Sequence, residues 1–428
     1  MRKIKNQRAL ATSPIRKDAL RILEAGLEAI DTEKAIKKNI KITKKELIVK
    51  HQSYSLENVE NIYLVGVGKC VIDAAQVLEK KLKRRLKGGI VYGTNKNEIK
   101  KYKKLKLLTG NHPTPKEENV QNSQEILDFL KNTTEKDLVL FLISGGGSSL
   151  LCLPIDKDCT TEQRVFNELT EKGAIIEELN TVRKHISKAR GGRLAEAAYP
   201  SRVISIVFSD VPGDDLGFIS SGPTYKDKTT VEDAKKVLEK YSVTGVDQLL
   251  METPKDDKYF DNAAHILFIS NKDALAAMKT EAQRLGYNTE IKSTTLKGEA
   301  REIGARIGRA LDILTESTCF LYGGETTVKI GGRGRGGRNQ EVSLGALSEM
   351  QEPELVVSFA SDGLDNTDAA GALADFQSLN LAKEKNLNIR DYLEKNDSYD
   401  FFKALDDQLI TGPTGSNVSD LIIALKKC

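Results

Sequence analysis

The chain has 428 residues, of which 39% are hydrophobic and 29% are charged, and its formal net charge at pH 7 is +4. That length allows about two or three domains with their own cores, and the composition excludes an intrinsically disordered protein. The small net charge gives no reason to expect a polyanionic partner such as a nucleic acid.

The spacing of the cysteines and the lengths of the apolar runs indicate the cellular compartment of the protein. Five cysteines are widely spread and form no CxxC or Cys/His cluster, so we expect no structural zinc site. The first residues are basic but lack the apolar core of a signal peptide, and no apolar run approaches membrane-spanning length. We therefore expect a cytoplasmic, reduced protein with no membrane partner.

Apolar runs of strand length alternate with helical periodicities along the chain. Strands are expected at 61–67, 89–92, 105–108, 138–144, 203–209, 265–270, 288–291, 318–322 and 355–360. Helices are expected at 15–30, 71–86, 118–131, 161–173, 231–241, 272–286, 298–315 and 371–386. This alternation predicts an α/β fold with doubly wound parallel sheets, whose ligands bind beyond the carboxyl ends of the strands. The polar segment 249–262 marks the expected boundary, between domains 1–258 and 259–428.

Gly66–Lys69 lies between an expected strand and an expected helix, which is the context of a nucleotide-binding loop. It is neither a P-loop nor a complete GxGxxG, because Val71 occupies the place of the last glycine. Lys69 at a helix N-terminus is unfavourable with the helix dipole unless an anion also binds there. We interpret Lys69 as a functional residue; the alternative is a lysine that extends into solvent.

A second glycine-rich loop follows the apolar strand 138–143. Its three glycines and the serine hydroxyls beside them could form a nest of hydrogen-bond donors for phosphate oxygens. The residues concerned are Ser144, Gly145, Gly146, Gly147 and Ser148. The alternative is a tight turn capped by a serine, and a serine-hydrolase elbow is excluded because GxSxG is absent.

Segment 180–193 is rich in basic residues. On one helix, Arg183, Ser187 and Arg190 would share a face. Arg183 and Arg193 are the candidates in this segment for binding an acid or a phosphate. Equally, the segment could be a solvated surface helix that ends at its glycine pair.

The segment 331–338 is a Gly/Arg loop that precedes an expected helix. Glycines let amides approach an anion and arginines add fixed positive charge, so we predict a phosphate or carboxylate site at the helix N-terminus. The candidates are Gly336, Gly337, Arg338 and Asn339. The alternatives are a solvated hairpin loop and a flexible nucleic-acid-binding tail, although such tails do not lie between apolar periodic segments.

Carboxylates follow two of the expected strands, at 209–215 and 361–368. Mg²⁺ in nucleotide sites takes one or two carboxylates plus phosphate oxygens, and a further carboxylate can accept the proton of an attacking hydroxyl. Asp214, Asp215 and Glu325 are therefore candidate metal ligands, and Asp210 and Asp362 candidate catalytic residues. Either cluster alone could instead be an Asx-turn that caps a helix.

Taken in order, the motifs resemble those of the glycerate 2-kinases whose C-terminal part is called the MOFRL domain. The resemblance covers roughly residues 15–425. It rests on Gly66–Lys69, Gly110–Pro115, Ser144–Ser149, 180–193, Ser209–Asp215, Ser221–Thr224, Gly323–Val328, Gly336–Glu341, Ser361–Gly363, Asp368–Gly371 and Thr411–Asp420. In two places the chain departs from the pattern: Lys116 stands where relatives tend to have Asp, and relatives usually have a longer, Gly-Pro-containing version of the loop after Ser361.

The resemblance implies ATP-dependent phosphorylation of D-glycerate to 2-phosphoglycerate with Mg²⁺ or another divalent cation. It also implies a larger Rossmann-like N-terminal domain, a smaller C-terminal MOFRL-type domain and a cleft between them. The functional lysine of the family falls on Lys69 and the arginine of its GGRNQ motif on Arg338. The alternatives are a hydroxypyruvate reductase, a kinase of another small hydroxy acid, or a nucleic-acid binder. The choice between monomer and homodimer stays open.

Overall fold

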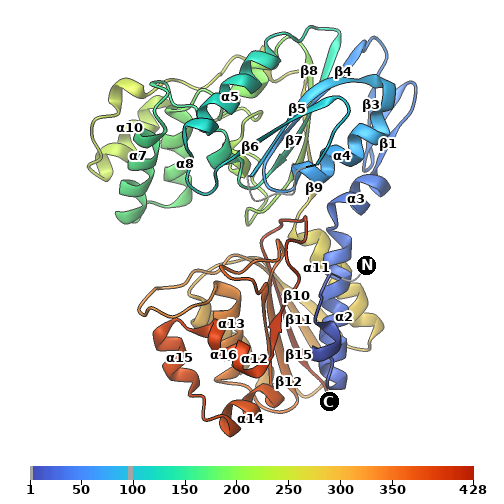
Figure 1. The fold of residues 1–428 in the computed structure, drawn as a ribbon, viewed down its shortest axis with the longest axis vertical. Helices are drawn as coiled ribbons and strands as arrows, with labels where there is room; N and C mark the ends of the chain where they lie inside the picture. The colour runs from blue at the N-terminus through green and yellow to red at the C-terminus, as the bar shows by residue number, and fades with distance from the viewer. Residues whose placement is uncertain (1–2, 95–99) are drawn as a thin grey trace. The chain divides into compact units, whose positions relative to one another are not determined.

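A computed structural model describes residues 3–94 and 100–428 of the chain (Figure 1). The chain forms two compact units, one of Ala35–Phe268 and one of Met1–Lys34 with Ile269–Cys428. These units differ from the expected division at residue 258 in two respects. Segment 263–268 completes the sheet of the first unit, and the N-terminal helices belong with the C-terminal residues. Within the part of the chain that the structure describes, every helix is too short or too polar to span a membrane.

The unit of residues 35–268 is built on a six-stranded sheet of order β6-β5-β4-β7-β8-β9. Its strands are β4 (Asn61–Val67), β5 (Leu86–Thr94), β6 (Leu105–Gly110), β7 (Asp137–Ser144), β8 (Arg202–Phe208) and β9 (Ala263–Ile269). β4 pairs in parallel with β5 and β7, β5 with β6, and β7 with β8. All of β7 is buried, as expected for a central parallel strand covered on both faces. The predicted Rossmann-like parallel sheet is confirmed.

Besides the six-stranded sheet, this unit contains a second, smaller sheet and several helices. A small antiparallel sheet contains β1 (Ile40–Ile42), β2 (Glu46–Val49) and β3 (Gln52–Ser55). Val165, Leu179 and Leu238 belong to a separate apolar cluster, from α7, α8 and α10. The helices are α3 (Thr32–Asn39), α4 (Val71–Leu82), α5 (Glu117–Leu130), α6 (Gly147–Leu150), α7 (Cys159–Glu171), α8 (Ile176–His185), α9 (Arg193–Ala198) and α10 (Val231–Lys240), with short 3₁₀ turns at 83–85, 219–221, 247–249 and 257–259.

The second unit contains a mixed six-stranded sheet of order β10-β11-β15-β12-β13-β14. Its strands are β10 (Asn288–Leu296), β11 (Thr318–Gly324), β12 (Glu354–Ala360), β13 (Gly371–Asp375), β14 (Gln408–Leu409) and β15 (Asp420–Lys426). β10 and β11 are parallel, whereas the pairs of β15 with β11 and β12, and of β13 with β12 and β14, are antiparallel. The expectation of a parallel sheet was therefore wrong here. The expected helix at 371–386 is also wrong at its start, because 371–375 pairs with β12 as a strand.

Helices cover both faces of this second sheet (Figure 1). On one face α2 (Pro14–Ala29) packs against α11 (Asn271–Arg284), with α1 (Gln7–Leu10) beside α2. The opposite face carries α12 (Ala300–Asp312), α13 (Arg338–Leu347), α14 (Phe376–Glu384), α15 (Ile389–Lys395) and α16 (Ser398–Leu405). Buried Arg16 of α2 forms ion pairs of 2.6 Å with both Asp375 and Asp407. These pairs help to explain why the N-terminal helices belong to this unit.

Candidate functional site

Lys69 lies just beyond the carboxyl end of β4, against the loop that follows β7. A Cβ added at Gly68, whose φ is +131°, would lie 2.2 Å from the Ser144 hydroxyl oxygen. The glycine therefore allows the two loops to meet. The Lys69 amide donates to the Gly145 carbonyl at 2.9 Å. The Cγ of Lys69 lies 3.0 Å from the position of a Cβ at Gly146. The structure thus brings Lys69 together with the predicted loop Ser144–Ser149.

Side chains from several elements hold that loop. The Ser220 hydroxyl donates to the Ser144 carbonyl at 2.6 Å, and Asn119 of α5 donates through Nδ2 to the Ser149 carbonyl at 3.2 Å. Arg190 donates to the Ser148 carbonyl, and its fully buried guanidinium forms an ion pair with Glu162 at 2.8 Å. Sequence reasoning missed Asn119 and Ser220, because neither lies in a pattern of its own that indicates a contact with this loop.

The basic segment 180–193 is not one helix, because α8 ends at His185. The expected common face of Arg183, Ser187 and Arg190 is therefore wrong. The Arg183 guanidinium stacks on Phe166, 3.9 Å from the ring centroid. Burial and the nearby Arg190 charge lower the pKa of Arg183 to about 10. Arg193 donates to the Ser187 carbonyl at 3.0 Å and to the Glu252 carbonyl at 2.7 Å.

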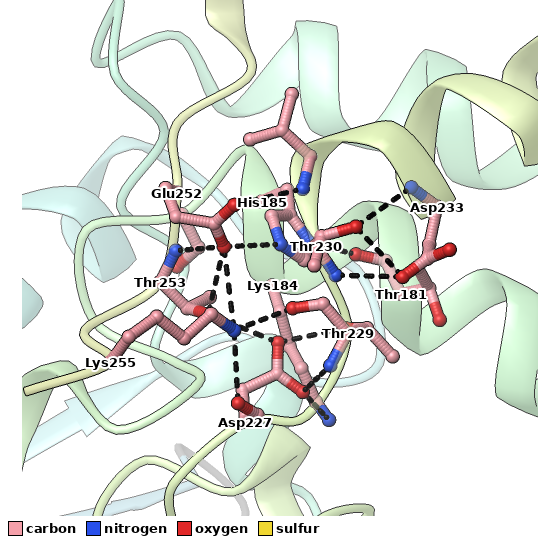
Figure 2. A network of polar contacts seen from close by, with 12 residues as sticks. Thr181, Lys184, His185, Asp227, Thr229, Thr230, Asp233, Glu252, Thr253 and Lys255 are labelled. Atoms are coloured by element: carbon pink, nitrogen blue, oxygen red, sulfur yellow. Dashed lines mark hydrogen bonds and ion pairs between the residues drawn. The ribbon is translucent and has the colours of Figure 1, made fainter. Parts of the chain in front are cut away.

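A partly buried polar network surrounds the end of α8 (Figure 2). Lys184 forms an ion pair with Asp227 at 3.1 Å, and both side chains are almost fully buried. Burial opposes ionisation of Asp227, but Lys184 and the neighbouring hydrogen bonds lower the pKa of its carboxyl overall. His185 contacts the Thr181 carbonyl through Nδ1 at 2.8 Å and Glu252 through Nε2 at 3.3 Å. Since Lys184 and His185 are interior residues, the alternative of a solvated surface helix does not apply to them.

The turn after β8 carries the first carboxylate cluster. Asp210 is half-buried just beyond the end of β8. The pKa of the Cys70 thiol is raised to about 12, mainly by burial and to a smaller extent by the negative charge of Asp210. Asp210 therefore lies near the start of α4, on the same sheet edge as Lys69. Asp214 has a left-handed backbone with φ of 61°. Asp215 accepts the Gly217 amide through Oδ1 at 2.7 Å, which is the geometry of an Asx-turn.

In the second unit, Arg338 is the first residue of α13 and is held by two carboxylates. Its Nε donates to Asp420 at 2.6 Å and its Nη2 to Glu325 at 2.7 Å. Burial raises the pKa of Asp420 to about 7, although Arg338 opposes this effect. A cavity of about 630 Å³ is lined by Arg338, Asp420, Asp362, Asn417 and Ser419 among others. The arginine side chain keeps 36% of its surface exposed, so it can still meet a ligand.

Several backbone amides of the Gly/Arg loop donate to acceptors of the protein itself, which the prediction of an anion site did not expect. The amides of Gly331 and Gly332 donate to the Asn396 side chain at 2.8 and 2.9 Å. Those of Gly334 and Arg335 donate to residues 395 and 397 at 2.8 and 2.9 Å. The protein's own acceptors therefore already satisfy these donors.

The protein's own Asp365 likewise occupies the N-terminus of α13. Its carboxylate accepts the amides of Asn339 at 3.2 Å and Gln340 at 2.9 Å. A Cβ at Gly337 would lie 2.2 Å from Asp365 Cγ, and one at Gly336 would lie 2.2 Å from the Ser398 hydroxyl oxygen. The glycines thus allow close packing of protein against protein. The Asn339 side chain is buried and accepts the Ser358 hydroxyl at 2.6 Å.

The predicted metal ligands are distributed over both units. Asp214 and Asp215 belong to the unit of residues 35–268, whereas Glu325 belongs to the other and pairs with Arg338. Asp362 lines the cavity and accepts the Leu364 amide through Oδ1 at 3.1 Å. Across residues 3–94 and 100–428, no group of three or more His, Cys, Asp or Glu side chains is arranged to hold a metal ion.

The two units therefore offer different chemistry. The edge of the parallel sheet combines a lysine, a glycine-rich loop and nearby carboxylates, which suits phosphate groups and an accompanying cation. The cavity of the other unit combines one arginine with several carboxylates and amides, which suits a small ligand that carries both an anionic group and hydroxyls.

Comparison with known proteins gives one family match in each half of the chain. Residues 18–252 match a family model described as a domain of unknown function (DUF4147), and residues 318–420 match the MOFRL family. A glycerate 2-kinase of Pyrococcus horikoshii is 36% identical over 435 residues, covering 96% of this chain and 97% of that protein. A D-glycerate 2-kinase of Thermotoga maritima is 36% identical over 429 residues, covering 96% and 98%.

Two further matches bear on fold and activity. The crystal structure of a Thermotoga maritima glycerate kinase superposes with a TM-score of 0.86 at 35% identity, covering 96% of this chain and 99% of that one. An Agrobacterium vitis protein provisionally named hydroxypyruvate reductase is 37% identical over 335 residues, covering 74% of this chain and 76% of that protein.

Proposed function

The chain belongs to the glycerate 2-kinase family, and we propose that it transfers the terminal phosphoryl group of ATP to the 2-hydroxyl of D-glycerate. The observation that carries the proposal is the match to glycerate 2-kinases over 96% of the chain, which includes both units. Lys69 at the carboxyl edge of the parallel sheet supports it, because ligands of such sheets bind at that edge.

We assign the cationic roles to Lys69 and Arg338, each within its own unit. Phosphoryl transfer is catalysed mainly by positioning and by neutralising charge. Lys69 binds the transferred phosphoryl group, and Arg338, fixed by Asp420 and Glu325, binds the substrate carboxylate. Asp362 lines the cavity beside Arg338 and is the alternative candidate for the base.

The remaining candidate residues divide into those that bind phosphate directly and those that act indirectly. The amides of Gly145–Ser148 bind phosphate oxygens. Arg183 and Arg193 act indirectly, because Phe166 and two backbone carbonyls already engage their guanidinium groups. Gly336, Gly337 and Asn339 place Arg338 by packing α13 against its neighbours.

The donor set of the turn after β8 fits a divalent cation that accompanies ATP. Mg²⁺ bound to nucleotide phosphates needs only one or two protein carboxylates, which Asp214 and Asp215 supply. When bound, the cation neutralises charge on the phosphate oxygens. Asp210, half-buried on the same edge as Lys69, accepts the proton of the attacking hydroxyl. Glu325 forms an ion pair with Arg338 and is therefore not assigned to the cation.

The location and the oligomeric state belong to the same proposal. All five cysteines are free thiols, as expected in the reducing cytoplasm. We place the chain in the cytoplasm for this reason. Light scattering after gel filtration distinguishes the monomer from the homodimer.

The direct test is ³¹P NMR of the purified protein with ATP, Mg²⁺ and D-glycerate. The expected result is a 2-phosphoglycerate resonance. A 3-phosphoglycerate resonance would contradict the position of transfer, and the absence of any phosphoester would contradict glycerate as substrate. Other small hydroxy acids, supplied in the same way, test the kinase activity on a different acceptor.

Substitution of Lys69 tests its assigned role. Lys69→Ala removes the cation at the sheet edge, and we expect kcat to fall at least about 100-fold with both substrates saturating. Lys80→Ala, at an exposed lysine of helix α4, which follows Lys69 in the chain, is the matched control and should keep its activity. Turnover that survives in Lys69→Ala at saturation would show that the mechanism is wrong.

The name of the Agrobacterium vitis relative favours hydroxypyruvate reduction as a second candidate activity. The incomplete dinucleotide motif speaks against it, because Val71 occupies the place of the last glycine. NADH oxidation with hydroxypyruvate decides the question. A chain that phosphorylates glycerate and leaves NADH unoxidised is a kinase alone.

A further inference from the structure

Asn180 of α8 has a defined amide orientation. Its Nδ2 donates to the Ile176 carbonyl at 3.0 Å, and a carbonyl oxygen can only accept. The amide oxygen Oδ1 therefore faces the other way, toward the Ser221 hydroxyl at 2.7 Å. Because Oδ1 cannot donate, Ser221 must donate its single proton to Asn180.

This orientation decides the direction of the next hydrogen bond. The hydroxyl oxygens of Ser148 and Ser221 are 2.9 Å apart, and either atom alone could be the donor. The proton of Ser221 is already committed to Asn180. Ser148 must therefore donate its own single proton to Ser221, and what remains to the Ser148 hydroxyl is its capacity to accept.

Ser148 is also held in place and is partly exposed. Its backbone carbonyl accepts from the fully buried Arg190, whose own position is set by the ion pair with Glu162. Ser148 is half-buried, whereas Ser221 is fully buried, so of these two hydroxyls a ligand can reach only that of Ser148. The loop that carries it lies at the carboxyl end of β7, beside Lys69.

An acceptor at this position discriminates among the groups of a ligand. Phosphate oxygens of ATP and the carboxylate of a hydroxy acid are acceptors themselves, so neither forms a hydrogen bond with this oxygen. A ligand hydroxyl can donate to it. In the proposed reaction the 2-hydroxyl gives up its proton to a base, and a neutral serine oxygen is too weak a base for that role. The ribose hydroxyls of ATP can donate as well, but they lie at the other end of the triphosphate from the terminal phosphoryl group that Lys69 binds. The donor that remains is therefore the hydroxyl on C3 of glycerate.

We infer that Ser148 is a specificity-determining residue that accepts a hydrogen bond from the 3-hydroxyl of the acceptor substrate. The inference rests on the proposed function and corrects the expected role of the Ser148 side chain as a phosphate ligand. The backbone amides of the loop keep that role. The enzyme thereby selects hydroxy acids with a second hydroxyl over those with a methyl group in its place.

The test is a cycle of one substitution and one substrate change. Isothermal titration calorimetry measures the binding of D-glycerate and of D-lactate, which lacks the 3-hydroxyl, to the wild type and to Ser148→Ala. A neutral hydrogen bond predicts that the wild type prefers D-glycerate by about 3- to 10-fold. In Ser148→Ala the affinity for D-glycerate falls by the same factor, the affinity for D-lactate stays, and the preference disappears.

Three results would overturn the inference. The first is a wild type that binds both acids equally, which needs no variant and so does not depend on the folding of one. The second is a Ser148→Ala protein that loses affinity for both acids by the same factor, as a merely structural role would predict. The third is a selective loss of ATP affinity, which would return the side chain to phosphate binding. Calorimetry needs no turnover, so a chain that binds glycerate without phosphorylating it contradicts the proposed function separately.

Discussion

Asp420→Asn tests whether the buried carboxylate fixes Arg338 for the reaction. The wild-type carboxylate accepts from Nε at 2.6 Å and from Nη2 at 3.1 Å, and it carries the charge that opposes the guanidinium. The amide can accept through one oxygen only and is neutral. A hydrogen bond to a charged group contributes about 1.5–3 kcal/mol. Because Arg338 is 36% exposed, and Glu325 still holds it, we expect the lower end, about a 10-fold loss in kcat/KM.

The pH dependence gives a second, sharper readout of the same substitution. Burial raises the pKa of Asp420 to about 7, so in the wild type the carboxylate becomes protonated and its hold on Arg338 weakens as the pH falls through about 7. We therefore expect wild-type kcat/KM to decline on that acid side. The variant has no group to titrate at this position and should lack this decline.

The assay is steady-state phosphorylation of D-glycerate from pH 5.5 to 9, followed by ADP release. Asp312→Asn makes the same chemical change at an exposed position of the same unit and serves as the control, with a wild-type profile expected. The reasoning is refuted if Asp420→Asn keeps the acid decline unchanged, or if its kcat/KM at pH 8 equals that of the wild type.

The remaining predictions concern the free energy of unfolding, measured by urea denaturation. Gly337→Ala should destabilise the protein by about 1–3 kcal/mol, since the new Cβ would lie 2.2 Å from Asp365 Cγ. Gly331→Ala is the control and should change the free energy of unfolding little, because the nearest atom to its new Cβ is 3.9 Å away. Equal effects of the two would contradict the packing argument. Arg16→Ala should cost about 3–5 kcal/mol because it leaves two buried carboxylates without their partner, and the exposed Arg8→Ala should cost almost nothing. A small loss for Arg16→Ala would mean that those carboxylates tolerate burial alone.

The sequence predicts the first sheet well because its strands are simple to recognise. A parallel strand that is covered on both faces, such as β4 or β7, is a continuous apolar run followed by a polar loop. The loops with Lys69 and Ser144–Ser149 could be placed for the same reason, since the carboxyl ends of parallel strands share one edge.

The second sheet was harder to predict because tertiary pairing overrides local preference there. Residues 371–375 are rich in Ala and Leu, which favour a helix, yet they pair with β12 as a strand. Antiparallel pairing of the C-terminal β15 with two strands places it inside the sheet. The ion pair of Arg16 with Asp375 joins residues 359 positions apart, a distance over which helical or strand periodicity carries no information.

The two glycine-rich loops have similar compositions but use their backbones in opposite ways. In Gly331–Arg335 the protein's own oxygens accept the amides, so these glycines fasten the loop to 395–397. In Ser144–Ser149 it is the carbonyls that are engaged, each of the six accepting from a backbone amide or a side chain. Because the N–H and C=O of a planar trans peptide point in opposite directions, a loop that turns its carbonyls toward the protein turns its amides away from those partners. Glycine content indicates close approach in both loops, but only the partners of the peptide groups distinguish a loop that packs on protein from one that can bind phosphate.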